Sequence, residues 1–443
     1  MGGESATSVF ARLEPPAPLT RQEALAEADR CLMCWDAPCI RACPTAIDVP
    51  EFIKRIATGD DVGSARTILS SNILGSSCAR VCPTEVLCEG ACVLNDLHTR
   101  PIQIGRLQGY STDPVVLGGI QIFAKGEPSG RSVAVVGAGP AGLSCAAELV
   151  QYGHDVVVLD AAESPGGLNT RGVADYKLRS ETAIAEVAWI EELGVEIRQG
   201  VTVGTDVAVD VLLDEYDALF LGVGLGDIMP VGIPGEDLPG SEDALQFIAR
   251  LKANSRQEMS LEGQRVAVIG GGNTAIDAAT QSARLGAEKV YLIYRRGRQE
   301  MRAYDHEVEL AMADGVEFIF WTAPVAISGT DSVTGLACRR TEVVDSQVTL
   351  LDGTDSHLEV SRVFRATGQE KRRSFLEEIP GVETDHGGRV VLDEDFRTGN
   401  QKIWAGGDCA NGGKEVVNAV AHGKQAAQSI NASLRGEAVS TGR

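Results

Sequence analysis

Residues 31–44, CLMCWDAPCIRACP, and residues 78–92, CARVCPTEVLCEGAC, decide how this chain is organised. Eight of its eleven cysteines fall within these two blocks. Short loops between cysteines supply several thiolates to one iron–sulfur cluster, and in two-cluster ferredoxins the cysteine before a proline binds the other cluster. Each block has such a pair, at Cys43 and Cys82. The sequence therefore predicts two [4Fe–4S] clusters that share ligands between the blocks.

Zinc and disulfide bonds are the alternative uses of these cysteines. Structural zinc sites often combine paired cysteines with histidine, and no histidine precedes His98. Disulfide bonds are typical of exported proteins, but the N-terminal MGGESATSVFARLEPP lacks the basic segment and apolar run of a signal peptide. We therefore expect iron–sulfur clusters and a reducing, cytoplasmic location.

Composition narrows the class of protein. A chain of 443 residues can hold two or three domains, and 44% hydrophobic with 23% charged residues is typical of a globular protein. The formal net charge of −22 argues against a nucleic-acid partner, because nothing could neutralise a phosphate backbone. No apolar stretch approaches the ~18 residues of a membrane-spanning helix. We expect neither nucleic acid nor membrane among its partners.

Residues 1–125 are predicted to form an all-helical domain around the two clusters. Thr20 and Glu23 are spaced as a capping box at the start of a helix. The segments VPEFIKRIATGD and SARTILSSNI carry apolar residues at helical spacing. Because β-branched runs are few, no sheet is expected here.

At Ser132 the pattern changes to strands alternating with helices. SVAVVG, AGLSCAAELVQYG and DVVVLD are predicted as strand, helix and strand, and the order recurs in RVAVIGGGNTAIDAATQSARLGAEKVYLIYRR. Such βαβ units build parallel sheets covered by helices. The fold class is therefore α/β: an N-terminal all-helical iron–sulfur domain followed by two Rossmann-like nucleotide-binding domains, the second inserted in the first. After the helical domain, the predicted segments are 126–255 (FAD-binding, first part), 256–365 (NADPH-binding) and 366–443 (FAD-binding, second part).

The first βαβ unit contains the dinucleotide-binding pattern GxGxxG. Gly137 allows a tight turn, Gly139 lets a pyrophosphate approach the backbone, and Gly142 lets the helix pack closely on the strand. Asp160 ends the second strand, where an acid can bind ribose hydroxyls. Strand, glycines, helix and acid together predict a dinucleotide site.

Two further segments identify this dinucleotide as FAD. Gly166, Gly167 and Leu168 follow the acid closely, and Gly407-Asp408 near the C-terminus has the form of a second flavin motif. An N-cap of the last helix is the alternative role for Asp408. Because the pieces are far apart in sequence, the FAD domain is predicted to be discontinuous.

The second glycine turn, GGGNTA at residues 270–275, is followed by a strand that ends in arginine instead of an acid. Arginines such as Arg295 and Arg296 accommodate the 2′-phosphate of NADP, and Arg302 could close on the same phosphate. A solvated arginine pair is the alternative. The pattern favours NADPH over NADH.

Cys145, Cys338 and Cys409 stand alone, and no CxxC pair occurs in either Rossmann-like unit. They are predicted to be packing residues. Electrons therefore cannot end on a redox disulfide of the thioredoxin-reductase kind, and the clusters are their predicted exit.

With these features assembled, the chain resembles a known family. CLMCWDAPCIRACP, SCARVCPTEVLCEGAC, PIQIGRLQGY and GAGPAGLSCA look like the flavin- and iron–sulfur-carrying subunit of bacterial dihydropyrimidine dehydrogenase and the N-terminal half of the animal enzyme. The resemblance covers nearly the whole chain. The glutamate synthase small subunit is a relative of that family. Its second cysteine block resembles CPxPC, whereas Cys82 and Cys88 here are separated by five residues.

The resemblance implies how ligands and cofactor contacts divide. One cluster would be held by Cys31, Cys34, Cys39 and Cys92, and the other by Cys43, Cys82, Cys88 and Gln108, with Cys78 a bystander. FAD contacts would fall on Gly137, Ala138, Gly139, Pro140, Ala141, Asp160, Gly167, Leu168, Lys177, Gly407 and Asp408. NADPH contacts would fall on Gly271, Gly272, Asn273, Thr274, Arg295, Arg296, Arg302, Ala366, Thr367 and Gly368. Asp160 and Lys177 stand where the family has glutamate and, in the animal enzyme, arginine.

The function implied is electron input. NADPH would reduce FAD, which splits the electron pair into single electrons, and the two clusters would pass these on to a partner subunit. Nothing in the sequence resembles an FMN site or a pyrimidine pocket, so a second, FMN- and iron–sulfur-containing subunit is expected to reduce uracil or thymine to 5,6-dihydropyrimidines. The alternatives are the small subunit of an NADPH-dependent glutamate synthase or a related NAD(P)H:ferredoxin-type oxidoreductase and, in a different class, a non-catalytic scaffold subunit.

Overall fold

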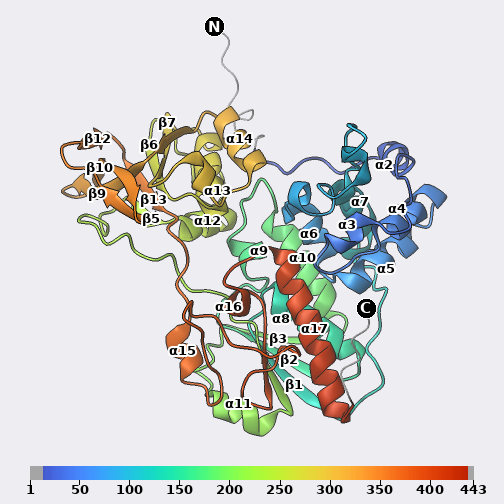
Figure 1. Cartoon of the computed structure of the whole chain (residues 1–443). Helices are drawn as coiled ribbons and strands as arrows, with labels where there is room; N and C mark the ends of the chain where they lie inside the picture. The colour runs from blue at the N-terminus through green and yellow to red at the C-terminus, as the bar shows by residue number, and fades with distance from the viewer. Residues whose placement is uncertain (1–12, 438–443) are drawn as a thin grey trace. The chain divides into compact units, whose positions relative to one another are not determined.

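The computed structural model describes residues 13–437 and confirms the α/β fold class (Figure 1). Residues 1–12 of the predicted helical domain lie outside the described part of the chain. The chain divides into two compact units. What we call the insert unit comprises residues 13–16, Arg171–Arg179 and Gly226–Glu370, and the main unit comprises Ala17–Thr170, Ser180–Leu225 and residues 371–437.

Helices fill the N-terminal part of the main unit, as predicted. They are α2 (Arg21–Ala28), α3 (Pro38–Arg41), α4 (Val49–Thr58), α5 (Asp61–Ser71), α6 (Gly75–Val81) and α7 (Ile104–Val116), with 3₁₀ turns η1 (Thr84–Val86) and η2 (Val93–Asn95). Thr20 and Glu23 form the predicted capping box, in which each side chain accepts a hydrogen bond from the other residue's backbone N–H.

The main unit also contains a five-stranded parallel sheet in the order β14-β4-β1-β2-β3. Its strands are β1 (Ser132–Val136), β2 (Asp155–Asp160), β3 (Glu196–Gln199), β4 (Ala218–Leu221) and β14 (Ile403–Ala405). The helices between and after them are α8 (Pro140–Gln151), α9 (Leu168–Arg171), α10 (Ser180–Glu191), α11 (Val209–Glu215), α15 (Arg373–Glu377), α16 (Asp408–Asn411) and α17 (Val416–Arg435). Because β14 joins the sheet only after the insert, the first dinucleotide-binding fold is discontinuous. Within the described residues, no helix is long and apolar enough to cross a membrane.

One hydrophobic core joins the helical part to this sheet. Leu69 of α5 and Leu74, just before α6, belong to the same buried cluster as Val133 and Val135 of β1. Trp189 of α10 packs in that cluster as well. The helical part is therefore held on the first dinucleotide-binding fold by packed side chains of α5 and of the segment before α6.

The insert unit is built on a second five-stranded parallel sheet in the order β5-β13-β6-β7-β8. Its elements are β5 (Ser241–Asp243), α12 (Ala244–Ala253), β6 (Arg265–Ile269), α13 (Asn273–Arg284), β7 (Lys289–Tyr294), η3 (Arg298–Glu300), α14 (Asp305–Ala313), β8 (Glu317–Phe320) and β13 (Arg362–Arg365). A small antiparallel sheet adds β9 (Thr322–Gly329), β10 (Val333–Val344), β11 (Gln347–Leu350) and β12 (Ser356–Leu358). Because β5 pairs with β13, this sheet begins earlier in the chain than the predicted boundary at residue 256.

Candidate iron–sulfur and dinucleotide sites

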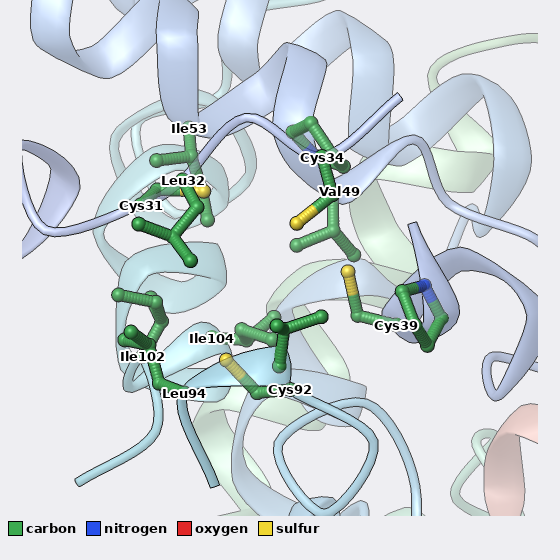
Figure 2. A pocket seen from close by; sticks show the side chains of 13 residues that line it. Cys31, Leu32, Cys34, Cys39, Val49, Ile53, Cys92, Leu94, Ile102 and Ile104 are labelled. Carbon is green, nitrogen blue, oxygen red and sulfur yellow. The ribbon is translucent and has the colours of Figure 1, made fainter. Parts of the chain in front are cut away.

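Four predicted cluster ligands line one pocket of the main unit. Cys31 and Cys34 lie in the loop after α2, Cys39 lies on α3, and Cys92 directly precedes η2. Figure 2 shows the thiols of Cys34, Cys39 and Cys92 turned toward the same space. The remaining wall is mainly apolar and includes Val49, Ile53, Leu94, Ile102 and Ile104. Such a wall excludes water and leaves the sulfur atoms as the polar contacts of whatever lies inside.

The electrostatics of these thiols fit a cationic occupant. Burial, together with Cys31 and Cys92 nearby, raises the pKa of the Cys39 thiol to about 11. Burial also raises the pKa of Cys31, and Cys34 and Cys92 act in the same direction. Thiolates crowded in an apolar wall are unfavourable alone but are the required ligands of iron, whose positive charge stabilises them. The donor set therefore suits a [4Fe–4S] cluster.

The second predicted set gathers around Cys82, directly after α6. A hydrogen bond with Cys78, together with burial, raises the pKa of the Cys82 thiol, and Cys88 and Cys43 act in the same direction. Burial, followed by Glu89 and Cys43, raises the pKa of Cys88. The structure thus brings three predicted ligands together and places Cys78 beside them.

Gln108, the predicted eighth ligand, is buried on α7. Its side-chain amide nitrogen donates to the carbonyl oxygen of Gly75 over 2.7 Å. In the described part of the chain no hydrogen-bond donor contacts its carbonyl oxygen, which is the atom that could bind iron. The ligand role of Gln108 stays a prediction, and its amide orientation is compatible with it.

The side chains that the structure describes form no site for a single metal ion. Among residues 13–437, no group of three or more His, Cys, Asp and Glu side chains is close enough to hold one metal ion. A four-iron cubane is wider than one ion and needs ligands further apart. All eleven cysteines are free thiols in the structure.

The first glycine turn has the geometry that its pattern predicts. Gly137 has φ 103°, and a Cβ there would lie 2.4 Å from the carbonyl oxygen of Gly222. A Cβ at Gly142 would lie 1.9 Å from the carbonyl oxygen of Gly137. Gly139 instead faces open space, with nothing within 4 Å of its would-be Cβ. Packing therefore requires two of the glycines, and the third leaves room for a phosphate at the start of α8.

The carboxylate of Asp160, at the end of β2, anchors the backbone of this turn. This buried carboxylate accepts hydrogen bonds from the N–H of Ala138 at 2.6 Å and of Ala162 at 2.7 Å. Because Ala138 stands between the first two glycines, the carboxylate fixes the turn against the end of β2. Binding of a ribose by Asp160 remains a prediction, and the turn-anchoring role is an addition to it.

The predicted segment around Leu168 meets the same turn. The N–H of Gly166 donates to the carbonyl oxygen of Ala138 at 2.8 Å. A Cβ at Gly167 would lie 2.9 Å from the Cα of Gly139. Leu168, exposed at the start of α9, follows directly.

The C-terminal flavin motif also returns to the first turn. A Cβ at Gly407 would lie 2.9 Å from the Cβ of Ala141, and the N–H of Gly407 points at Nδ1 of His422 over 3.3 Å. Asp408 begins the short helix α16, and its carboxylate accepts from the N–H of Lys414 at 3.2 Å. Burial raises the pKa of Asp408. Three segments far apart in sequence thus converge on one dinucleotide turn.

The second glycine turn repeats this plan in the insert unit. A Cβ at Gly270 would lie 2.4 Å from the carbonyl oxygen of Ala366, and one at Gly271 would lie 2.4 Å from the ring of Tyr294. Gly272, like Gly139, has nothing within 4 Å. The open position again directly precedes a helix, α13, which begins with the predicted contact residues Asn273 and Thr274.

The predicted arginines lie at the end of β7 and in the loop after it. Arg295 and Arg302 are exposed and Arg296 is half-buried. The backbone N–H of Arg302 donates to the carbonyl oxygen of Gly271 at 3.0 Å, which fixes its loop on the glycine turn. Across residues 13–437 none of the three guanidinium groups is paired with a carboxylate. They are therefore available for an anionic group beside the turn.

Residues 366–368 complete the second site from the end of β13. The N–H of Ala366 donates to the carbonyl oxygen of Ile269 at 2.8 Å, at the end of the neighbouring strand β6. The hydroxyl of Thr367 donates to the carbonyl oxygen of Met229. The N–H of Met229 in turn donates to the carbonyl oxygen of Gly368 at 2.8 Å. The structure therefore places this predicted segment beside the glycine turn.

Lys177 has partners within the insert unit that the sequence did not suggest. Its ammonium pairs with Asp277 of α13 at 2.7 Å and Glu307 of α14 at 2.6 Å. The hydroxyl of Tyr176 donates to Asp277 at 2.9 Å. Burial alone would lower the pKa of Lys177, but Asp277, Tyr176 and Glu307 raise it well above its usual value. The predicted FAD contact of this charged lysine stays a prediction.

Glu186 is a buried acid beside the second cysteine set that the sequence did not single out. It lies on α10, is fully buried, and bonds to the first turn of α6. A signal was present: Ala183 and Ile190, three residues before and four residues after Glu186 on the same helix face, are apolar and buried. A carboxylate on the apolar face of a helix needs a specific partner.

Two protein families match the chain. The pyridine nucleotide-disulphide oxidoreductase family matches residues 131–423. The family described as dihydropyrimidine dehydrogenase domain II, 4Fe-4S cluster, matches residues 10–118. The matches cover the sheet-bearing folds and the cysteine-bearing helices, respectively.

Similar proteins match over nearly their whole length. Glutamate synthase [NADPH] small chains from Halomonas elongata and Escherichia coli are 37% and 36% identical, over 93% of this chain and 91% and 92% of theirs. The NAD-dependent dihydropyrimidine dehydrogenase subunit PreT of Escherichia coli is 33% identical, over 93% of this chain and 95% of its own. The resemblance seen in the sequence is thus confirmed at the level of the two related groups together.

Solved structures share the fold of the two dinucleotide-binding units. Mycobacterium tuberculosis FprA in complex with NADPH has a TM-score of 0.56 at 22% identity, covering 70% of this chain and 86% of its own. Thioredoxin reductase from T. acidophilum has a TM-score of 0.54 at 22% identity, covering 68% of this chain and 99% of its own. With the cysteine pocket and the glycine turns in place, these matches show that the chain belongs to the pyridine nucleotide-disulphide oxidoreductase family and is an FAD- and NAD(P)H-dependent oxidoreductase with a 4Fe–4S domain.

Proposed function

We propose that this chain is the electron-input subunit of a heteromeric enzyme, taking electrons from NADPH through FAD and two [4Fe–4S] clusters to a partner subunit. The observation that carries the proposal is the main unit, in which Leu69 and Leu74 of the helical part share one hydrophobic core with Ala138 of the first glycine turn. A shared core keeps the distance between two redox sites constant, as electron transfer between them requires. FAD supplies the conversion of a hydride into single electrons.

The chain's own residues divide the work of binding. The open positions at Gly139 and Gly272 accept the two pyrophosphates at helix N-termini. Arg295 and Arg296, with Arg302 beside the second turn, bind the 2′-phosphate and make NADPH the proposed donor. The names of the relatives differ in the nucleotide: the glutamate synthase small chains are named with NADPH and PreT with NAD. Kinetics with both nucleotides therefore test this choice.

For the partner we propose an FMN- and iron–sulfur-containing subunit that reduces uracil or thymine, as in dihydropyrimidine dehydrogenase. Two observations support it: the helical part matches a family described by that enzyme's 4Fe-4S domain, and PreT, a named subunit of that enzyme, aligns over 93% of this chain. The cytoplasm, where thiols stay reduced, is the proposed location.

A glutamate synthase large subunit is the second candidate partner. The specific observation is the 37% and 36% identity to two glutamate synthase small chains, against 33% to PreT. Anaerobic co-purification from the native host, followed by assays of NADPH-dependent uracil reduction and of glutamate formation, separates the two. Uracil reduction supports the first candidate, and glutamate formation contradicts it.

Metal and flavin analysis tests the electron-input proposal itself. Purified anaerobically, the chain is expected to contain about eight irons and about one FAD, with little or no FMN. Iron near four, or zinc in its place, would contradict the two-cluster assignment.

Ligand substitutions test the division of the clusters. Gln108→Ala is expected to damage one cluster and leave the other, since loss of a ligand opens the site, whereas Cys78→Ser should leave both intact. Iron content and electron paramagnetic resonance of the reduced protein report on each cluster. Iron loss in Cys78→Ser with intact Gln108→Ala would show that Cys78 is the eighth ligand.

A further inference from the structure

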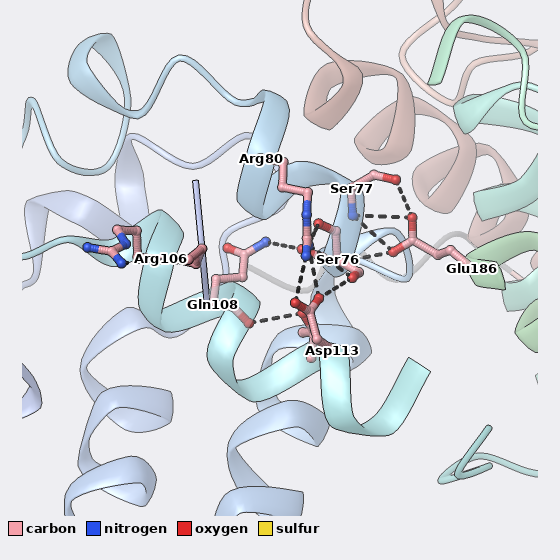
Figure 3. A network of polar contacts seen from close by, with 10 residues as sticks. Ser76, Ser77, Arg80, Arg106, Gln108, Asp113 and Glu186 are labelled. Atoms are coloured by element: carbon pink, nitrogen blue, oxygen red, sulfur yellow. Dashed lines mark hydrogen bonds and ion pairs between the residues drawn. The ribbon is translucent and has the colours of Figure 1, made fainter. Parts of the chain in front are cut away.

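A buried carboxylate anchors the helix that leads to the second cysteine set. Glu186 accepts hydrogen bonds from the N–H of Ser76 at 2.9 Å and of Ser77 at 3.3 Å, and the Ser77 hydroxyl donates to the same carboxylate (Figure 3). Leu74, the residue before α6, offers no side-chain acceptor. Glu186 therefore caps α6 from another helix and satisfies N–H groups that the helix leaves open.

The same turn of α6 orients Gln108. The carbonyl oxygen of Gly75, adjacent to Ser76, accepts from the side-chain amide of Gln108 at 2.7 Å. Because a carbonyl oxygen can only accept, the amide NH₂ must face Gly75 and the amide oxygen must face away from it. The helix then runs directly into Cys82. A tilt of its first turn would move both predicted ligands of the second cluster.

An ion pair braces this arrangement from the other side. Arg80 of α6 pairs with Asp113 of α7 at 2.7 Å and donates to the carbonyl oxygen of Ser76 at 2.9 Å. The Ser76 hydroxyl donates to Asp113 as well, so α6 is tied to the helix that carries Gln108 (Figure 3). Burial raises the pKa of Glu186 to about 7 against the opposing effect of Ser77, Ser76 and Arg80. An acid held in an apolar core at such a cost is best explained by what it orders.

We propose that Glu186 is a positioning residue for the second [4Fe–4S] cluster, acting through the first turn of α6 to hold the carbonyl oxygen of Gln108 and the thiol of Cys82 in place. The inference rests on the proposed function, in which Cys43, Cys82, Cys88 and Gln108 hold that cluster. It adds a residue from α10, in the sheet-bearing part of the main unit, to a site otherwise built from the cysteine-bearing helices. Outer partners of metal ligands typically change metal affinity 10- to 100-fold.

The test compares Glu186→Gln with Glu191→Gln in the full, FAD-loaded chain prepared anaerobically. Glu191 lies on the same helix, and burial alone shifts its pKa, so it is the matched control. In Glu186→Gln we expect the iron of the second cluster, half of the total, to pass to a chelator about tenfold faster than in the unmodified protein. The resonance signal of one reduced cluster should change, while FAD content stays constant. Ser77→Ala removes only the hydroxyl donor and should show the same change to a smaller extent. It tests the proposal on its own if Glu186→Gln fails to fold.

Three results would overturn the inference: unchanged iron release in both Glu186→Gln and Ser77→Ala, faster release from both clusters equally, or a change in the signal of the cluster held by Cys31. The unmodified protein separates this inference from the proposed function. If that protein contains only about four irons, the two-cluster proposal fails first. If it contains about eight irons, and Glu186→Gln and Ser77→Ala both release iron as slowly as the unmodified protein, the positioning role alone is wrong.

Discussion

The two glycine turns share one backbone plan and differ in what closes them. In both, a glycine open to solvent precedes a helix, and neighbouring glycines exclude any Cβ by close backbone or ring contacts. The first turn is closed from below by the carboxylate of Asp160, which accepts from Ala138. The second turn is closed by the ring of Tyr294, and Arg295 and Arg296 follow Tyr294 in the chain.

This difference separates the shared task from the specific one. Binding a pyrophosphate needs only the open glycine and the helix N-terminus, which both turns have. Choosing between dinucleotides depends on the charge at the end of the second strand, which is negative in the main unit and positive in the insert unit. Three predictions test this comparison.

The largest effect is expected at the arginine pair that follows strand β7 in the insert unit. Replacing both Arg295 and Arg296 by Ala removes two charge-assisted hydrogen bonds to the 2′-phosphate, each worth roughly 1.5–3 kcal/mol. Discounted for exposure, this should raise KM for NADPH about a hundredfold and change KM for NADH little. Dye reduction by the chain alone measures both constants.

Arg265→Ala is the matched control for the arginine pair, since this residue lies at the start of β6 and pairs with Glu288 and Glu359. It should leave both constants unchanged. Equal use of NADH and NADPH by the unmodified protein would show that the arginines of the second turn face solvent, and the two turns would then differ less than proposed.

A smaller effect is expected at the negative end. Asp160→Asn removes the charge and turns an NH₂ toward a backbone donor, so one charge-assisted hydrogen bond worth about 1.5–3 kcal/mol is lost. FAD should dissociate about tenfold or more faster, as flavin fluorescence on dilution would report. Asp155→Asn, at the exposed start of the same strand, should retain FAD normally. Normal FAD retention by Asp160→Asn would show that the turn does not depend on the carboxylate.

The smallest effect is expected from exchanging the third small residues, Gly142 and Ala275. Gly142→Ala places a methyl group 1.9 Å from a carbonyl oxygen and should cost about 1–3 kcal/mol of stability. Ala275→Gly opens a buried helix position and should cost about 1 kcal/mol. Thermal unfolding followed by circular dichroism measures both, with Gly139→Ala as the control because its Cβ meets nothing within 4 Å. A larger loss in Ala275→Gly than in Gly142→Ala would contradict the packing difference.

Several features were decided by the sequence alone because their physics is local. The capping box of Thr20 and Glu23 involves residues three apart, and the structure shows it as predicted. The order of strand, glycine turn and helix in both Rossmann-like folds follows from apolar runs and from glycine positions where a Cβ cannot fit. Spacing also identified the cysteine blocks, and the four ligands that the resemblance predicts for one cluster line a single pocket of the structure.

Only the tertiary structure could decide contacts between segments far apart in the chain. The strand β5, Ser-Glu-Asp, has no apolar run of its own and is a strand only because β13 pairs with it. Lys177 meets Asp277 and Glu307, and Glu186 meets α6, across a hundred residues or more in each case. The sequence can mark a residue such as Glu186 by its apolar neighbours, but it does not identify the partner, because the packing of distant segments decides which groups meet.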